Sequence, residues 1–140
     1  MIRGAKPISA ILFNNFQFLI SKIMFSLKKF SKSLKYAGKG ILLVFREEQN
    51  FRLQAAAGAV VLFLAWYFHL PVWQWIVLIL VISFVLVLEL INSIFERVID
   101  IVKPGIDDYV RAIKDIMAGA VFIASIVALI VGILIFAPLF

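Results

Sequence analysis

The sequence predicts an all-α membrane protein in which three transmembrane helices are preceded by an amphipathic interfacial helix. Three observations support this fold class. Hydrophobic residues make up 64% of the 140-residue chain, whereas soluble domains contain about 45–50% apolar residues. The stretches 72–88 and 116–140 contain no charged residue, and the second is long enough to cross a bilayer. Ten of the fourteen Lys and Arg residues lie in residues 1–52, so a basic arm precedes the apolar part of the chain.

The composition also narrows the possible chemistry and partners. The chain has no cysteine, which excludes disulfides, thiolate catalysis and cysteine-based metal sites. Its net charge of +6 is concentrated in the arm. A basic arm on an apolar protein favours contact with anionic lipid headgroups. Because the chain has no nucleic-acid recognition module, we expect no nucleic-acid partner.

We divide the chain into an N-terminal basic amphipathic extension, residues 1–29, and a membrane domain, residues 30–140. Apolar residues recur at helical spacing through residues 8–34, and lysine and amide side chains lie opposite them. This pattern is typical of a helix that lies in the headgroup layer. A signal peptide is the alternative for residues 8–20, but two adjacent asparagines interrupt its apolar run.

Two glycines, Gly38 and Gly40, interrupt the second half of the arm. Because glycine is a poor helix former, we expect the helix to loosen there before it resumes toward Glu47 and Glu48. The pattern assigns no role to residues 1–27.

The three predicted spans cover about residues 53–70, 72–95 and 114–138. The first is rich in alanine, and its end is surrounded by aromatic residues of the kind that gather at membrane interfaces. We therefore interpret His69, the one histidine of the chain, as an interfacial residue rather than a ligand. A proline–glycine pair separates the second span from the third.

The basic residues predict the orientation of the spans. The arm holds ten of them, and the loop between the second and third spans holds Arg97, Lys103, Arg111 and Lys114. The turn at 69–71 and the C-terminal tail hold none. Because positive charge marks the cytoplasmic side, we expect a multi-pass protein of the cytoplasmic (inner) membrane with its N-terminus in the cytoplasm and its C-terminus outside.

Residues 89–100, at the end of the second predicted span, carry the most chemical information. At 100° per residue, one helix face of about 100° of arc holds Glu89, Asn92, Ser93, Glu96 and Asp100, while Arg97 falls outside it. One interpretation is a helix end whose charges reach for water. The other is a site that holds a metal ion and moves a proton. We favour the second because Glu89 and Asn92 lie on the apolar side of the predicted boundary, where ionised groups are disfavoured.

These residue types together suit phosphoryl transfer to a hydroxyl. Glu48 and Glu96 supply oxygen ligands of the kind that Mg²⁺ prefers, and Lys114 supplies positive charge for a phosphate. Desolvation strengthens Glu89 as a general base. Arg52 follows Glu48 by four residues, so a surface ion pair is the alternative for these two. No Walker A loop or soluble-kinase signature is present, so the spacings by themselves do not identify the nucleotide.

Glu89-Leu-Ile-Asn92-Ser-Ile-Phe-Glu96-Arg-Val-Ile-Asp100 resembles the signature Glu-x-x-Asn-[Ser/Thr]-x-x-Glu-x-x-x-Asp of the prokaryotic diacylglycerol kinase and undecaprenol kinase family. Three further motifs match the family in order: Lys35-Tyr36-x-x-Lys39-Gly40, Glu47-Glu-Gln-Asn-Phe-Arg52 and Lys114-Asp115-x-x-Ala-Gly-Ala-Val121. The resemblance covers about residues 30–136 and leaves residues 1–27 outside it.

The resemblance implies that residues 30–140 form a membrane lipid-kinase domain. It implies a homotrimer of three-span subunits with shared active sites, each subunit carrying an amphipathic surface helix. The implied reaction transfers the γ-phosphate of ATP to a membrane lipid alcohol, either diacylglycerol to give phosphatidic acid or undecaprenol to give undecaprenyl phosphate. Mg²⁺ is the implied cofactor, and ATP is the co-substrate.

The resemblance also implies residue roles. Catalysis is assigned to Glu89, as proton acceptor, and to Asn92. The Mg²⁺ ligands would be Glu48 and Glu96, and Arg52 and Glu89 would contact the lipid. Nucleotide contacts are implied for Lys29, Tyr36, Glu48, Glu96, Asp100, Lys114 and Asp115.

The chain departs from the diacylglycerol kinase branch at three places. Gly105-Ile106-Asp107 replaces a Glu-Tyr-His trio, so no contact is assigned to that loop. Phe95 is bulkier than the usual residue before the second glutamate of the signature. Lys29 replaces an arginine and cannot bind a phosphate bidentately. The Glu-Glu-x-Asn-Phe-Arg and Ala-Gly-Ala-Val variants resemble the undecaprenol kinase branch more, although no short motif determines the lipid.

Two other functional classes remain as alternatives. A cation or proton transporter would place acidic residues near mid-membrane on more than one span, but the first predicted span and residues 116–140 contain none. A non-catalytic membrane scaffold, or a degenerate family member that has lost catalysis, needs no cluster of Glu, Asn and Lys. Stabilisation of the purified protein by Mg·ATP would distinguish a kinase from a scaffold.

Overall fold

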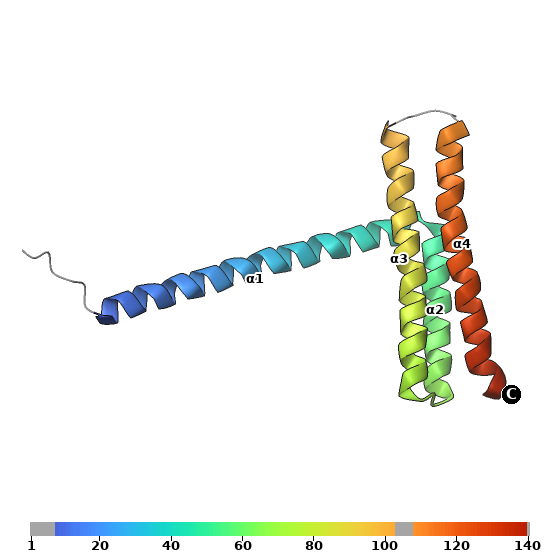
Figure 1. Ribbon diagram of the computed structural model, residues 1–140, viewed down its shortest axis with the longest axis horizontal. Coiled ribbons are helices and arrows are strands. Elements are labelled where there is room, and N and C mark those ends of the chain that lie inside the picture. Colours follow the sequence, from blue (N-terminus) through green and yellow to red (C-terminus); the bar gives the residue numbers. More distant parts are fainter. Residues whose placement is uncertain (1–7, 103–107, 140) are drawn as a thin grey trace, which may run out of the picture. The chain divides into compact units, whose positions relative to one another are not determined.

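The protein is helical throughout the part that its computed structural model describes, which is residues 8–102 and 108–139, with side chains from residue 27 onward. The elements are α1 (Ile8–Glu47), α2 (Gln49–Tyr67), α3 (Val72–Val102), α4 (Asp108–Phe136) and a short 3-10 helix, η1 (Ala137–Leu139) (Figure 1). The predicted all-α class is confirmed for these ranges. The chain divides after Gly40 into two compact units. The predictions for Lys103 and for Gly105-Ile106-Asp107 lie outside the described residues, as does the beginning of the predicted extension.

The first unit contains most of α1, which continues without a break through Gly38 and Gly40. The loosening predicted at these glycines is therefore wrong. Each glycine disfavours helix by about 1 kcal/mol relative to alanine, but a helix that is already nucleated on both sides propagates cooperatively through isolated weak positions. The apolar side chains of Leu27, Phe30 and Leu34 are more than half exposed. The location of this helix at a membrane surface stays a prediction.

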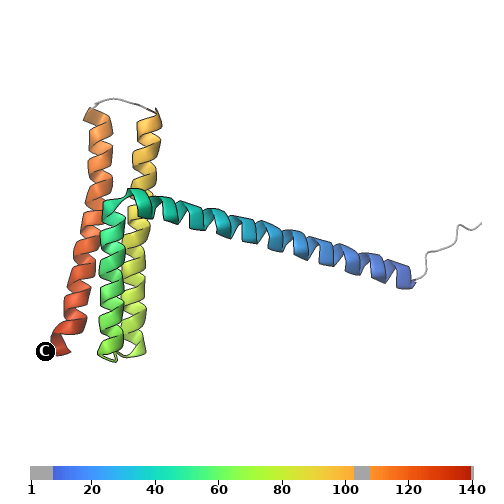
Figure 2. The ribbon, with the colours of Figure 1, turned by 180° about the vertical axis from the view of Figure 1, so that it is seen from behind.

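In the second unit, α2, α3 and α4 lie side by side, with α3 in contact with both of the others (Figure 1, Figure 2). α3 runs antiparallel to each neighbour (Figure 1, Figure 2). The start of α2, the end of α3 and the start of α4 therefore lie toward the same end of the bundle. This arrangement gathers the acidic residues of α3 and the residues around Glu48 on one side of the apolar core.

The turn between α2 and α3 closes with a Schellman motif. The amide of Leu70 donates to the carbonyl of Ala65, the amide of His69 donates to that of Trp66, and both N–O distances are 3.1 Å. His69 adopts the left-handed conformation that this motif requires, with φ of 54°. Leu70 and Ala65 pack in a buried cluster with Leu78 and Ile135. The chain reversal is thus fixed by backbone hydrogen bonds and by burial of Leu70.

Two described helices are long and apolar enough to cross a membrane, by length and composition: Val72–Val102 and Asp108–Leu139. They contain the second and third predicted spans. α2 does not meet this criterion because four of its first six residues are polar, namely Gln49, Asn50, Arg52 and Gln54. α2 also ends at Tyr67, earlier than the predicted end at residue 70. The first span therefore stays a prediction.

Candidate functional site

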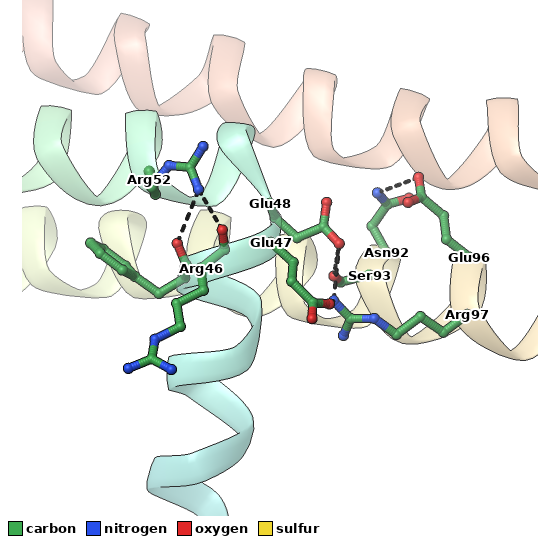
Figure 3. A network of polar contacts seen from close by, with 9 residues as sticks. Arg46, Glu47, Glu48, Arg52, Asn92, Ser93, Glu96 and Arg97 are labelled. Atoms are coloured by element: carbon green, nitrogen blue, oxygen red, sulfur yellow. Dashed lines mark hydrogen bonds and ion pairs between the residues drawn. The ribbon is translucent and has the colours of Figure 1, made fainter.

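Glu48 stands at the break between α1 and α2, and this break directs its side chain toward α3. Its backbone is extended, with φ of −98° and ψ of 115°, and its side chain does not cap α2. Instead, Glu48 Oε1 accepts hydrogen bonds from Ser93 Oγ at 2.9 Å and from Arg97 Nη2 at 3.1 Å (Figure 3). Residues forty-five or more positions apart in the sequence are thus joined at one point.

Arg97 connects Glu47, the last residue of α1, with Glu48, which follows it. Its Nη2 lies 3.1 Å from Glu47 Oε2 and 3.1 Å from Glu48 Oε1. The sequence analysis placed Arg97 outside the acidic face and missed this contact. The available signal was its spacing of four residues from Ser93, which puts both side chains on neighbouring parts of one helix surface. From there the long arginine side chain reaches the junction between α1 and α2.

Arg52 binds the end of α1 and not the carboxylate of Glu48. Its Nη1 donates to the carbonyl of Arg46 at 2.7 Å and to that of Phe45 at 3.4 Å. The last carbonyls of a helix lack intrahelical partners and favour a nearby cation. The ion pair considered between Glu48 and Arg52 is therefore not formed, since Glu48 pairs with Arg97. The implied contact of Arg52 with the lipid stays a prediction.

The predicted polar face of α3 is buried at its centre. Glu89 is 3% exposed, Asn92 8% and Ser93 1%. Asn92 Nδ2 donates to Glu96 Oε1 at 3.1 Å, so adjacent residues hold the two predicted metal ligands: Asn92 holds Glu96, and Ser93 holds Glu48 (Figure 3). Asn92 Oδ1 is buried without a hydrogen-bond partner in the described part of the chain. Buried polar atoms in native proteins are rarely left unpaired, so this oxygen is an acceptor that the described part of the chain leaves open.

Within the described residues, the side chain of Glu89 receives one hydrogen bond, from Gln54 of α2, whose Nε2 lies 3.4 Å from Glu89 Oε2. The sequence analysis did not identify Gln54. Its signal was a strongly polar side chain just inside the first predicted span, six residues after Glu48. Gln54 also lines a cavity of about 610 Å³ between α2, α3 and α4, whose other described lining residues are apolar except for Ser125.

The remaining predicted site residues are distributed over α1, α3 and α4. Lys114 forms an ion pair with Asp100, which links α4 to the outer end of the acidic face. Asp115 is exposed beside Lys114. Lys29 and Tyr36 are exposed on the first unit, where Lys32 Nζ lies 6.0 Å from the centre of the Tyr36 ring. Their nucleotide contacts stay predictions.

The oxygen atoms of this site fit a Mg²⁺ ion that arrives with phosphate groups. Across the described ranges, no three His, Asp or Glu side chains form a metal site by themselves. Glu48 and Glu96 nevertheless supply carboxylate oxygens that Ser93 and Asn92, neighbours in the sequence of α3, hold by hydrogen bonds. Mg²⁺ is commonly held by one or two carboxylates together with substrate phosphates and water. The donor set therefore suits a nucleotide-bound magnesium ion better than a metal held by protein alone.

Comparisons with known proteins show which family the chain is similar to. A sequence model of the family described as prokaryotic diacylglycerol kinase matches residues 35–136. The undecaprenol kinase of Bacillus subtilis (strain 168) is 36% identical over 112 residues, which cover 80% of this chain and 91% of that protein. A diacylglycerol kinase of Synechocystis sp. is 37% identical over 101 residues, which cover 71% of this chain and 58% of that protein.

Proposed function

This chain belongs to the prokaryotic diacylglycerol kinase family, and from that membership we propose that it transfers the γ-phosphate of ATP to the hydroxyl of a membrane lipid alcohol. Diacylglycerol and undecaprenol are the two candidate acceptors, because one relative is named for each. The match with the family model confirms the family that the sequence motifs predicted.

The observation that carries the proposal is the position of Glu89 between two unlike environments. On one side, the next residues of the same helix face are Asn92 and Ser93. Asn92 holds the carboxylate of Glu96, and Ser93 holds that of Glu48. On the other side, Gln54 connects Glu89 to an apolar cavity. A kinase acting on lipid needs this juxtaposition, since one substrate is a charged nucleotide and the other is an apolar chain that ends in a hydroxyl.

In the proposed reaction, Glu89 accepts the proton of the lipid hydroxyl. The hydroxyl oxygen forms a bond to the γ-phosphorus, the bond from that phosphorus to the β–γ bridging oxygen breaks, and ADP leaves with the bonding electrons. Glu48 and Glu96 would hold Mg²⁺, which when bound neutralises charge on the phosphates. Lys114 adds a positive charge near the same end, and Asn92 orients Glu96.

The proposal includes the setting of the enzyme. We place α2, α3 and α4 across the cytoplasmic membrane, with the acidic end facing the cytoplasm that holds ATP. We also propose a homotrimer with active sites shared between subunits, as the family resemblance implies. Nucleotide contacts of Lys29, Tyr36, Asp100 and Asp115, and lipid contact of Arg52, belong to the same proposal.

The test is ATP-dependent phosphorylation of both lipids in detergent micelles. Replacing Glu89 by Gln removes the general base, so we expect the turnover rate to fall by about 10²–10⁴-fold. Mg·ATP should still raise the melting temperature of Glu89→Gln, whereas Glu96→Gln should lose that stabilisation. Asp108→Asn makes the same kind of change at an exposed acid outside the site and should match the parent.

Equal turnover by the parent and Glu89→Gln would show that Glu89 is not the general base. If the parent phosphorylates no lipid alcohol, the kinase proposal is wrong and the non-catalytic membrane scaffold is favoured. Relative turnover of diacylglycerol and undecaprenol decides which lipid is the substrate.

A further inference from the structure

The cavity between α2, α3 and α4 is lined by one polar side chain that also contacts the proposed base. Gln54 and Ser125 are the polar residues among those that line it. Ser125 Oγ already donates to the carbonyl of Val121 at 2.9 Å, within its own helix. Ser125 is thus oriented by its own helix, whereas Gln54 joins the cavity to Glu89 of α3.

In the described chain, the amide nitrogen of Gln54 has a hydrogen-bond partner, but the amide oxygen has none. A glutamine amide offers two N–H donors and one acceptor oxygen. The nitrogen faces Glu89 Oε2 at 3.4 Å, as an ionised carboxylate requires, because it can only accept. Gln54 Oε1 is buried and has no hydrogen-bond partner in the described chain. This oxygen can therefore accept a hydrogen bond from a bound molecule.

The position of Gln54 places it between the cavity and the base. Glu89 is 3% exposed and is not among the residues that line the cavity, whereas Gln54 both lines the cavity and bonds Glu89. A chain that lies in the cavity therefore meets the Gln54 amide before it meets Glu89. The hydroxyl of a lipid alcohol is the one donor that the proposed substrates bring.

We propose that Gln54 is a positioning residue that receives the acceptor hydroxyl and aligns the base. Its Oε1 accepts the hydrogen bond of the hydroxyl as the lipid arrives, and its Nε2 holds Glu89 Oε2. The single hydroxyl hydrogen then turns from Gln54 Oε1 to the other carboxylate oxygen of Glu89, which takes the proton as the hydroxyl oxygen bonds to the γ-phosphorus. This inference rests on the proposed lipid-kinase function. The recognised chemistry is a primary alcohol at the end of an apolar chain, which diacylglycerol and undecaprenol share.

The test uses Gln54→Met in the full-length protein, because methionine keeps the length of the side chain and removes both amide groups. With dioctanoylglycerol in one arm and a short polyprenol in the other, we expect kcat/KM for the lipid to fall about tenfold or more, as loss of a buried hydrogen bond predicts. The KM for Mg·ATP should stay within about twofold of the parent value. Gln74→Met makes the same change at the far end of α3 and should leave both parameters unchanged.

A methyl ether of each lipid provides a second readout that a structural role would not change. A site that hydrogen-bonds a hydroxyl rejects analogues that lack it, so the parent should bind the alcohol more tightly than its ether, measured as inhibition constants. In Gln54→Met the two should become nearly equal. The melting temperature should change little, because the substitution removes an unsatisfied buried oxygen together with the hydrogen bond to Glu89.

Unchanged lipid kinetics in Gln54→Met, with an active parent, would overturn this inference and leave the kinase function standing. A lower melting temperature with equal losses toward lipid and Mg·ATP would also overturn it, because that result indicates a packing role. A parent that phosphorylates neither lipid would remove the kinase function and this inference with it.

Discussion

Glu89 is a carboxylic acid inside a helix that is otherwise rich in leucine, isoleucine and valine, and it is almost completely buried. The helical spacing of Glu89, Asn92 and Ser93 predicted that they share one face, and the burial of all three confirms that this face is turned inward. Unpaired polar groups are disfavoured in such surroundings. Each of the three accordingly makes at least one hydrogen bond, and Asn92 Oδ1 is an acceptor that the described part of the chain leaves open.

Ser93 gives a prediction at the residue scale. Its hydroxyl donates to Glu48 Oε1, so Ser93→Ala should loosen a proposed magnesium ligand. A hydrogen bond to a charged group contributes about 1.5–3 kcal/mol, so we expect the KM for Mg·ATP to rise about tenfold or more in steady-state assays. Ser93→Thr keeps the hydroxyl and should restore most of the affinity. If Ser93→Ala has the same KM for Mg·ATP as the parent, the hydrogen bond from Ser93 to Glu48 does not contribute to nucleotide binding.

Gln54 and Arg97 were the two site residues that the sequence did not reveal. Each acts through a residue on another helix: Gln54 binds Glu89, and Arg97 binds Glu47 and Glu48. A helical wheel orders the residues of one helix, but it contains no information about the register of α2 against α3. That register decides which residues meet.

At the scale of elements, α2 and α3 approach closely at Gly58. A Cβ atom built on Gly58 would lie 2.8 Å from Ile82 Cγ2, which is closer than side chains pack. Small residues allow such approaches between apolar helices, where packing replaces the hydrophobic effect as the driving force. This contact determines how closely α2 runs beside the helix that carries the acidic face.

Gly58→Ala should therefore destabilise the bundle. Overpacking of this kind costs about 1–3 kcal/mol, measured as the free energy of unfolding or as a lower melting temperature in micelles. The matched control is Gly119→Ala in α4, where nothing lies within 4 Å of the added Cβ. That variant should be neutral or slightly stabilised, because alanine is the better helix former. Equal effects at the two glycines would contradict the close approach.

The boundaries of elements were less predictable than their existence. The long apolar runs of α3 and α4 were evident from hydropathy, and both are helices. The continuity of α1 through Gly38 and Gly40 was not, because helix cooperativity outweighs single residues. The start of α2 at Gln49 was also hidden, since the break at Glu48 carries no glycine or proline.

At the scale of the whole molecule, the two ends of the bundle differ in charge. The ion pairs of Arg97 and Lys114 lie on the side where α2 begins and α3 ends. The turn between α2 and α3 contains aromatic residues and His69 but no charge. The positive-inside rule then predicts that Asp108 faces the cytoplasm and that Val72 faces outward.

Single-cysteine variants test this orientation directly, because the chain has no cysteine of its own. With a membrane-impermeant maleimide on intact cells, we expect Val72→Cys to react and Asp108→Cys to react only after the membrane is permeabilised. Both positions are exposed. Reaction of Asp108→Cys from outside would place the acidic end away from ATP and contradict the proposed kinase.

The ordered sequence motifs carried the resemblance to a lipid-kinase family. Hydropathy and helical periodicity by themselves determined the all-α class, the two most apolar helices, and the shared face of Glu89, Asn92 and Ser93. These properties are local, because they follow from residues within a few turns of one another. Only the tertiary structure decided that Ser93 and Arg97 hold Glu48, that Gln54 holds Glu89, and that an apolar cavity adjoins that pair. The physical reason is that these contacts depend on the register and closeness of packed helices, which side chains on several helices determine together.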